Sequence, residues 1–265
     1  MENIIVRVIG KDQRIKSEGR SSEEVNLYIK EAYEEGDFIS VIVKDLPGFY
    51  WMQLDEAKGA SMVYLTGDFT YPIPFEEKAV CMSPKVFKGD RHLINVRKAR
   101  SYEIEGYRNL ALNVNDQHGE PKCFPHASAN VETRGESVFA AFNAIDGITA
   151  TTDHGSWPYG SWGINQDPEA EFKLEFGRTV SIDRIVIYNR ADFPHDNWWT
   201  SMTVTFSEGG KEVLKTVRSA YAQEFTFEKR NIQWLTISEL IKSDDPSPFP
   251  ALTQIEVYGM EVEGI

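Results

Sequence analysis

Apolar and polar residues alternate along most of this chain with a period of two. Phe172, Leu174 and Phe176 are separated by charged residues, so an extended strand would place the three apolar side chains on one face. The segments 203–206 and 223–227 repeat the pattern with other apolar residues. Such alternation is typical of a strand with one buried and one solvated face. It predicts antiparallel sheets that are packed on one side.

Turn residues and one ambiguous segment complete this picture. The segment 207–211, Ser-Glu-Gly-Gly-Lys, lies between two alternating runs and predicts a hairpin. The segment 21–35 is the best helix candidate, because it begins with two serines that can cap a helix and continues with acidic residues. Yet Val25, Leu27 and Ile29 also alternate, so a strand is equally possible there. We predict an all-β chain.

The first hundred residues contain their own series of predicted strands, and turn sequences with Pro, Gly and Asp separate them. These strands are 4–9, 38–43, 50–54, 62–65 and 93–96. They are sufficient for a small sandwich. The segment 101–108 is short and charged, and we place a boundary there. The sequence therefore predicts two β-sandwich (jelly-roll) domains, residues 1–105 with an unknown role and residues 106–265.

Charge and composition narrow the classes of partner. The formal net charge of -13 argues against nucleic acid and anionic membranes, since a protein that neutralises phosphates needs a basic surface. No apolar run is long enough for a membrane span. The first residues are typical of a strand rather than a signal peptide. We expect a cytoplasmic protein, although a secreted protein whose signal had been removed would have the same sequence.

The two cysteines, Cys81 and Cys123, lack the spacing of a metal site or a disulfide framework. We expect two buried free thiols.

Six short segments follow one another in the second half of the chain. They are 109–113 (NLALN), 126–128 (HAS), 141–147 (AFNAIDG), 168–177 (PEAEFKLEFG), 181–190 (SIDRIVIYNR) and 254–259 (QIEVYG). In this order and spacing, residues 109 to about 261 resemble the discoidin, or coagulation-factor type C, family. The resemblance implies a galactose-binding-like β-sandwich. This fold hosts binding modules for sugars, lipids and proteins, so the fold alone does not decide the function.

The resemblance also implies a possible structural calcium, the only cofactor considered. Many members of the family bind calcium in a loop that an Asp-Gly pair opens, and Asp146 and Thr151 match two of the ligands. The chain departs from the family at Gln254, where glutamate is customary, and at Ile148, where an acidic or amide residue is usual. Losing charged ligands weakens calcium binding. Between a calcium site at Asp146, Thr151 and Gln254 and a simple tight turn, we favour the turn.

Two segments, 153–162 and 190–199, are dense in aromatic and polar side chains. In the family's fold both lie at strand ends near one rim, and the proline-rich segment 243–250 is expected to be a stiff connector there. A sugar stacks its C–H face on an aromatic ring, and its hydroxyls need hydrogen-bond donors and acceptors. The predicted ligand-binding residues are His154, Trp157, Tyr159, Arg190, Asp192, His195, Trp198 and Trp199.

Several of the aromatic residues have an alternative role in the core. One ring of the pair Trp198 and Trp199 is expected to point inward, because neighbouring residues of a strand face opposite sides. Trp162 stands near a strand start and is also expected in the core. Trp157 and Tyr159 are flanked by Pro and Gly, which favours exposure.

The polar residues have alternatives too. Arg190 ends a predicted strand and could pair with Asp192 or Asp196 instead of binding a ligand. His154 and His195 could bind zinc as a pair, but the sequence offers no third ligand at a suitable spacing.

Three functions compete at this stage. The first is carbohydrate binding without bond chemistry, through the residues given above. The second is a glycosidase or lyase that uses Asp153, Asp192 or Asp196 as acid and base beside His195. No nucleophile, metal or phosphate-loop motif supports this alternative. The third is a protein-interaction module, since exposed Trp, Tyr and Arg are favoured at such surfaces. We predict a carbohydrate-binding protein and expect no catalysis.

Overall fold

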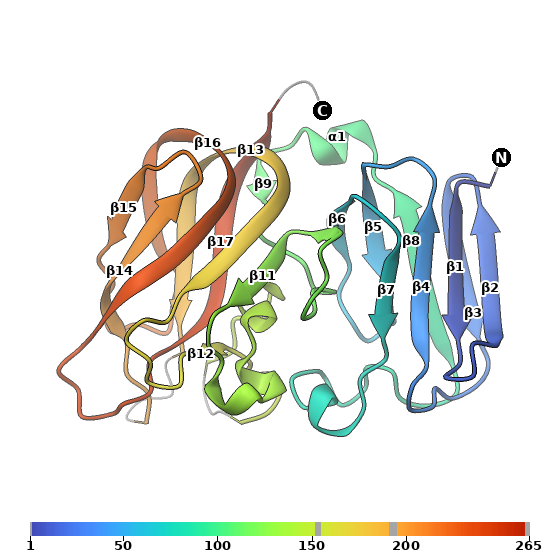
Figure 1. Ribbon diagram of the computed structural model, residues 1–265, viewed down its shortest axis with the longest axis horizontal. Helices are drawn as coiled ribbons and strands as arrows, with labels where there is room; N and C mark the ends of the chain where they lie inside the picture. Colours follow the sequence, from blue (N-terminus) through green and yellow to red (C-terminus); the bar gives the residue numbers. More distant parts are fainter. Residues whose placement is uncertain (1, 152–154, 191–194, 263–265) are drawn as a thin grey trace.

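The structure is a computed structural model that describes residues 2–151, 155–190 and 195–262. Strands make up almost all of the regular structure in these ranges, and the one α-helix among them is the single turn α1 (Ser101–Ile104). Figure 1 shows two layered β-structures side by side. The all-β fold class is therefore confirmed. No helix in the described ranges is long and apolar enough to cross a bilayer.

The first β-structure is a sandwich of a four-stranded and a five-stranded sheet, with orders β2-β1-β4-β7 and β10-β6-β5-β8-β3. The strands of the first sheet are β1 (Ile4–Ile9), β2 (Ile15–Ser21), β4 (Phe38–Val43) and β7 (Phe69–Pro72). Those of the second are β3 (Glu24–Ile29), β5 (Gly48–Gln53), β6 (Ser61–Leu65), β8 (His92–Lys98) and β10 (Cys123–Phe124). A 3-10 turn, η1 (Glu76–Ala79), follows β7.

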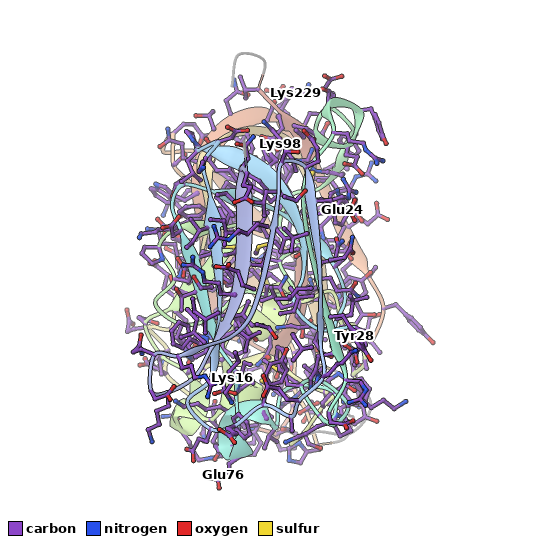
Figure 2. The ribbon with its side chains drawn as sticks, turned by 90° about the vertical axis from the view of Figure 1, so that its right-hand side faces the viewer. Lys16, Glu24, Tyr28, Glu76, Lys98 and Lys229 are labelled. Carbon is purple, nitrogen blue, oxygen red and sulfur yellow. The ribbon has the colours of Figure 1, made fainter. Side chains whose placement is uncertain are left out.

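Within the ambiguous segment 21–35, residues 24–29 form the strand β3, and no residue is helical. Val25, Leu27 and Ile29 are buried, while Glu24 and Tyr28 face outward. Figure 2, which views this sandwich from its outer side, shows Glu24 and Tyr28 along the same margin of the molecule. The alternating pattern decides, because burying one face of a strand contributes about 1.5–3 kcal/mol for each large apolar side chain.

The second β-structure is built on two unusually long strands, β13 (Phe172–Asn189) and β16 (Gln223–Lys242). The other strands of the same sheet are β9 (Arg108–Asn109), β11 (His126–Ala129), β12 (Trp162–Gly163), β14 (Trp199–Phe206), β15 (Lys211–Leu214) and β17 (Ala251–Glu261). Three 3-10 turns, η2 (Thr133–Gly135), η3 (Ser137–Phe139) and η4 (Ala141–Ile145), connect β11 to β12. The predicted hairpin at 207–211 joins β14 to β15 and is confirmed.

The long strands divide between two layers. Residues 172–175 of β13 pair with β11 and with the second part of β16, whereas residues 180–187 pair with β17 and with the first part of β16. Register shifts interrupt the pairing between these parts, and bulges of this kind bend a sheet. A single sheet thus wraps around a core that contains Phe172, Leu174 and Phe176.

The two sandwiches are joined by a short strand. Cys123 and Phe124 of β10 follow the predicted boundary at residue 105, yet they pair with Leu65 and Tyr64 of β6 in the first sandwich. Both Cys81 and Cys123 are buried and free, as the sequence predicted. The connection therefore completes a sheet of the first sandwich with residues from the beginning of the second.

Candidate functional site

A pocket of about 260 Å³ opens at the rim of the second sandwich, where β12 and β13 end and β17 begins. Figure 1 shows this end of the sandwich beside β12. Four chain segments that are distant in sequence meet there, and we call the hollow the rim pocket. Its lining residues are Thr133, Arg134, Phe139, Gly163, Ile164, Asn165, Gln166, Arg190, His195, Pro248, Phe249, Pro250 and Ala251.

A buried ion pair forms the base of the rim pocket. The Nε and Nη2 groups of Arg190 donate to Oδ1 of Asp196 at 3.0 and 2.8 Å, and Nη1 donates to Oγ of Ser161 at 3.3 Å. Arg190 is 4% exposed and Asp196 is fully buried. The sequence analysis assigned the Arg190 guanidinium to sugar hydroxyls and gave pairing with Asp196 as an alternative. In the structure, the guanidinium is used mainly for the ion pair with Asp196.

One wall of the rim pocket is aromatic. Phe249 is 42% exposed, and its ring is stacked on that of His195 with 5.5 Å between centroids and 13° between planes. Asn197 holds this loop, because its Nδ2 group donates to the carbonyls of Asp245 and Ser247. The ring of Phe249 thus offers a flat apolar surface that is fixed in place.

The opposite wall carries two exposed amides on a strained loop. Asn165 and Gln166 both have left-handed backbone angles, with φ of 50° and 59°. Non-glycine residues adopt such angles only at an energetic cost, and they concentrate at functional sites. Thr133 accepts a hydrogen bond from the backbone of Asn165 at 2.9 Å. A side chain at Gly163 would come within 2.7 Å of the Thr133 hydroxyl, so glycine is required where the two segments meet.

Phe139 also lines the rim pocket, and the guanidinium groups of two arginines lie near its ring. Its ring centroid is 5.3 Å from the guanidinium carbon of Arg134 and 5.6 Å from that of Arg190. Arg134 forms two hydrogen bonds with Glu136, so both cations near the ring have carboxylate partners. The rim pocket is therefore polar but close to neutral.

The structure separates the predicted aromatic residues from one another. Trp199 is 1% exposed and packs in the core with Trp162, at 6.2 Å between ring centroids, so its prediction as a ligand contact is wrong. Trp198 is half-buried, with the guanidinium carbon of Arg218 5.8 Å from its ring centroid.

The remaining predicted residues also differ in their placement. Trp157 is exposed and Tyr159 is half-buried, but neither lines the rim pocket, and the backbone N–H of Trp157 donates to the Val80 carbonyl. His154 and Asp192 lie outside the described residues. Of the predicted ligand contacts, Arg190 and His195 come together in the rim pocket.

Sequence reasoning missed most of the walls of this pocket. Phe139, Arg134, Asn165 and Gln166 carry no pattern that distinguishes them from ordinary loop residues. Phe249 has a usable signal, because it stands between two prolines, and a ring in a stiff connector has few ways to become buried.

The predicted calcium loop forms a hydrogen-bonded turn. Oδ1 of Asp146 accepts from the Ile148 N–H at 2.7 Å, and Oε1 of the buried Gln254 accepts from the Gly147 N–H at 3.2 Å. Gly147 has φ of 84°, which favours glycine. Burial raises the pKa of Asp146 to about 7, which favours the protonated carboxyl group. Thr151, which follows this turn in the sequence, is also buried. These residues fit a turn better than a calcium site, which needs several charged oxygens.

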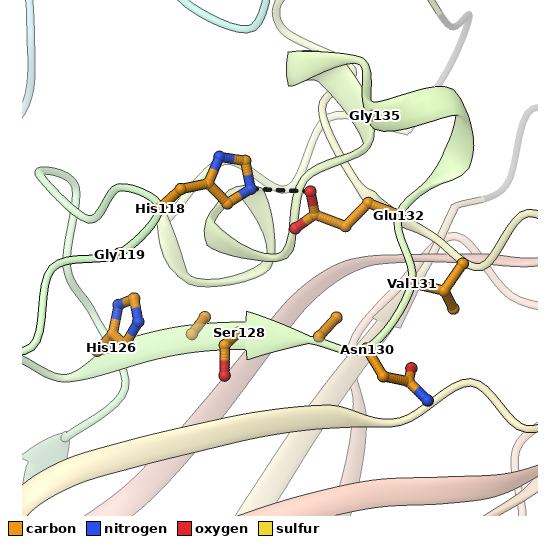
Figure 3. Close-up of a pocket in the computed structure, with 10 residues that line it drawn as sticks. His118, Gly119, His126, Ser128, Asn130, Val131, Glu132 and Gly135 are labelled. Atoms are coloured by element: carbon orange, nitrogen blue, oxygen red, sulfur yellow. Dashed lines mark hydrogen bonds and ion pairs between the residues drawn. The ribbon is translucent and has the colours of Figure 1, made fainter.

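A second pocket, of about 320 Å³, lies beside β11 and contains two histidine–carboxylate pairs. Figure 3 shows His118 reaching Glu132, at 2.8 Å, with His126 on the neighbouring strand. The hydrogen bond that the His118 ring donates to Glu132 raises the pKa of His118. Nδ1 of His126 is 2.7 Å from Oδ1 of Asp116; burial alone would lower the pKa of His126, but this bond raises it. We call this hollow the His118 pocket.

Comparisons with known proteins give distant similarities to solved structures. The lectin domain of lectinolysin complexed with Lewis B antigen has a TM-score of 0.42 and 17% identity, with 56% of this chain and 94% of that chain covered. A fucose binding module of Streptococcus pneumoniae has a TM-score of 0.40 and 14% identity, with 61% and 99% covered. The family 32 CBM from C. perfringens NanJ, in complex with galactose, has a TM-score of 0.37 and 19% identity, with 50% and 91% covered.

No protein-family model and no curated protein sequence matches this chain. Structural similarity this distant says nothing about the ligand that the chain binds.

Proposed function

We propose that this protein binds a carbohydrate in the rim pocket and makes or breaks no bond. The observation that carries the proposal is the exposed ring of Phe249, stacked on His195, in one pocket with the amides of Asn165 and Gln166. The ring suits the C–H face of a sugar. Each amide has donors and an acceptor, which is the combination that a hydroxyl group needs.

The rim pocket suits this ligand better than the His118 pocket does. The described lining of the His118 pocket contains no Phe, Tyr or Trp and consists largely of small residues of β11 and its flanks. Stacking is therefore available in the rim pocket alone of the two. Both arginines of the rim pocket are paired with carboxylates, which favours a neutral sugar over an anionic one. The discoidin-type assignment of residues 109–261 belongs to the same proposal.

The position of Asp196 argues against the glycosidase alternative. A catalytic acid or base must reach the bond that it cleaves. Asp196 is fully buried beneath Arg190, and no carboxylate is among the described lining residues of the rim pocket. Asp153 and Asp192, the other two candidates, lie outside the described residues.

The experiment is a glycan array followed by calorimetric titration of any sugar that binds. Phe249→Ala should weaken binding about five- to tenfold, because stacking on one ring contributes about 1–1.5 kcal/mol. Phe249→Trp should restore most of the affinity, since it keeps a flat ring. The matched control is Tyr221→Ala, which removes an 81% exposed ring elsewhere on the same sandwich and should leave binding unchanged.

An array without any bound glycan would contradict the proposal. Equal affinity of Phe249→Ala and the unmodified protein would place the sugar elsewhere. Turnover of a glycoside by the protein would replace binding with catalysis as the function.

A further inference from the structure

The first sandwich gathers two carboxylates and an imidazole at one end of its five-stranded sheet. Asp55 and Glu56 follow the end of β5, and His92 begins β8. These two strands are antiparallel neighbours, with Gln53 opposite Asn95, so the end of one lies beside the start of the other. One ligand atom from each of the three side chains lies within 4.8 Å of the other two. Sheet pairing therefore fixes the position of the cluster.

The hydrogen bonds of His92 leave one nitrogen facing an acceptor. Its Nε2 atom is 3.2 Å from the Gly89 carbonyl oxygen, which can only accept, so Nε2 carries the proton. Nδ1 is 3.3 Å from Oδ2 of Asp55. In a neutral imidazole, that nitrogen has a lone pair, and it would face a carboxylate oxygen. A proton between the two atoms, or a bound cation, would make this contact favourable.

The carboxylates are held in place as metal ligands usually are. Oδ1 and Oδ2 of Asp55 accept from the backbone N–H groups of Ala57 and Phe87, and Oε2 of Glu56 accepts from the Leu93 N–H. Hydrogen bonds of this kind orient the ligands around a metal ion. The bond from His92 to a backbone carbonyl plays the same part for the imidazole.

A buried hydroxyl beside the cluster is the second observation that points to a bound species. Tyr33 is 8% exposed, and its OH group has no hydrogen-bond partner among the described residues. Its ring packs against that of His92 at 4.2 Å between centroids. A bound species that carries a water molecule would offer the Tyr33 hydroxyl a hydrogen-bond partner.

We infer that Asp55, Glu56 and His92 bind a divalent first-row metal ion, with zinc as the best match. One nitrogen and two oxygen ligands are a set that zinc accepts. With zinc–ligand bonds of about 2.0–2.1 Å, two tetrahedral ligands are about 3.3 Å apart. Nδ1 of His92 and Oδ2 of Asp55 already have this separation. Three protein ligands leave one tetrahedral position for water.

The cluster is reachable from solvent through its third ligand. Asp55 and His92 are 1% exposed, whereas Glu56 is exposed. The Glu56 side chain can therefore complete the site by a small rotation after an ion has entered. A proton between Nδ1 of His92 and Oδ2 of Asp55 would involve these two groups only, whereas a cation would also use Glu56.

The test is a titration of the full-length protein, freed of metal with a chelator, by calorimetry with Zn²⁺ and by absorption with Co²⁺. We expect one ion for each chain, submillimolar affinity and a higher melting temperature with zinc. Glu56→Gln keeps the acceptor for the Leu93 N–H but removes a charged ligand, so zinc should bind at least about tenfold more weakly. His92→Gln should abolish the visible Co²⁺ band that a nitrogen ligand contributes.

Two controls separate this site from adventitious binding. Glu31→Gln changes an exposed glutamate of the same sandwich, and His118→Ala removes an exposed histidine of the other sandwich; both should bind zinc as the unmodified protein does. No zinc binding by the unmodified protein would overturn the proposal and leave a proton between His92 and Asp55 as the explanation of their contact. Equal binding by Glu56→Gln and Glu31→Gln would also overturn it, even if His92→Gln does not fold.

Discussion

The guanidinium of Arg178 in the second sandwich lies over the ring of Phe49 in the first, with 4.8 Å between the guanidinium carbon and the ring centroid. Its Nε and Nη2 groups also donate to Glu261 at 2.8 and 2.6 Å. Arg178 is 8% exposed, so these contacts are shielded from solvent. The Arg178 side chain thus contacts Glu261, at the end of β17 in the second sandwich, and Phe49 in the first sandwich.

Arg178→Ala should lower the free energy of unfolding by about 1.5–3 kcal/mol, because it removes one of the two arginines that donate to the Glu261 carboxylate and the contact with the Phe49 ring. Arg178→Lys should recover less than half, since an ammonium cannot donate to both carboxylate oxygens in the same geometry. Urea unfolding measures both values. The control is Arg20→Ala, whose side chain is 43% exposed and which should change stability by less than about 0.5 kcal/mol. Equal effects at the two arginines would show that the junction contributes little.

Arg190→Ala should act on stability before it acts on ligand binding. Removing the guanidinium takes two hydrogen bonds from the buried Asp196 carboxylate and leaves it the weaker contact with His195 at 3.2 Å, which costs about 2–3 kcal/mol. The double variant Arg190→Met with Asp196→Leu should be more stable than Arg190→Ala, because it removes both charges. Thermal unfolding of the three proteins tests this order. If Arg190→Ala has the melting temperature of the unmodified protein, the ion pair is not a structural element.

Asp146 should make stability depend on pH in the direction opposite to most carboxyl groups. Burial raises its pKa in the folded protein from 3.8 to about 7. The folded state therefore holds this proton more tightly than the unfolded state does. This contribution is complete below pH 3.8 and is lost as the pH rises through about 7.

Asp146→Asn keeps an oxygen for the Ile148 N–H and removes the titration. Relative to the unmodified protein, this variant should gain on the order of 1–2 kcal/mol between pH 4 and pH 8, a value reduced because Asp146 is not fully buried. Denaturant unfolding at several pH values measures the difference. The control is the exposed Asp68→Asn. A constant difference between Asp146→Asn and the unmodified protein would contradict the raised pKa.

Calcium at millimolar concentration should leave the melting temperature of the unmodified protein unchanged. Gln254→Glu should be less stable without calcium, because a second carboxylate is then buried near Asp146, and should gain stability when calcium is added. Differential scanning calorimetry with calcium, and with magnesium as the control ion, distinguishes the cases. A calcium-dependent melting temperature of the unmodified protein would restore the calcium interpretation.

The alternation of apolar residues predicted the strands well where one face is buried and the ladder is regular. The predicted strands 4–9 and 38–43 coincide with β1 and β4, and of the two possibilities left open for the segment 21–35 the structure has the strand, β3. The rule failed where bulges interrupt the ladder. Val204 and Phe206 are in the core, and counting back by two would place Trp198 there, yet register shifts on either side of Ser201 bring Trp199 inward.

The candidate site could be predicted only in part, because its residues meet through the fold and not through their spacing. Arg190 and His195 are near one another in sequence and share a segment that was singled out. Phe139, Asn165 and Phe249 come from three other segments, and no local pattern reports the distance between them. The Arg190–Asp196 pair illustrates the same limit, since a sequence cannot show whether a guanidinium binds a carboxylate of the protein or a ligand.

The strand β10 determines where this chain can be divided into fragments without damaging the first sandwich. A fragment that ended at residue 105 would lack Cys123 and Phe124, and β6 would become an outer edge with unpaired amides and carbonyls. Such edges recruit strands from other molecules. Cutting after residue 124 instead would keep the five-stranded sheet whole, and during synthesis that sheet cannot close until the ribosome has passed this point.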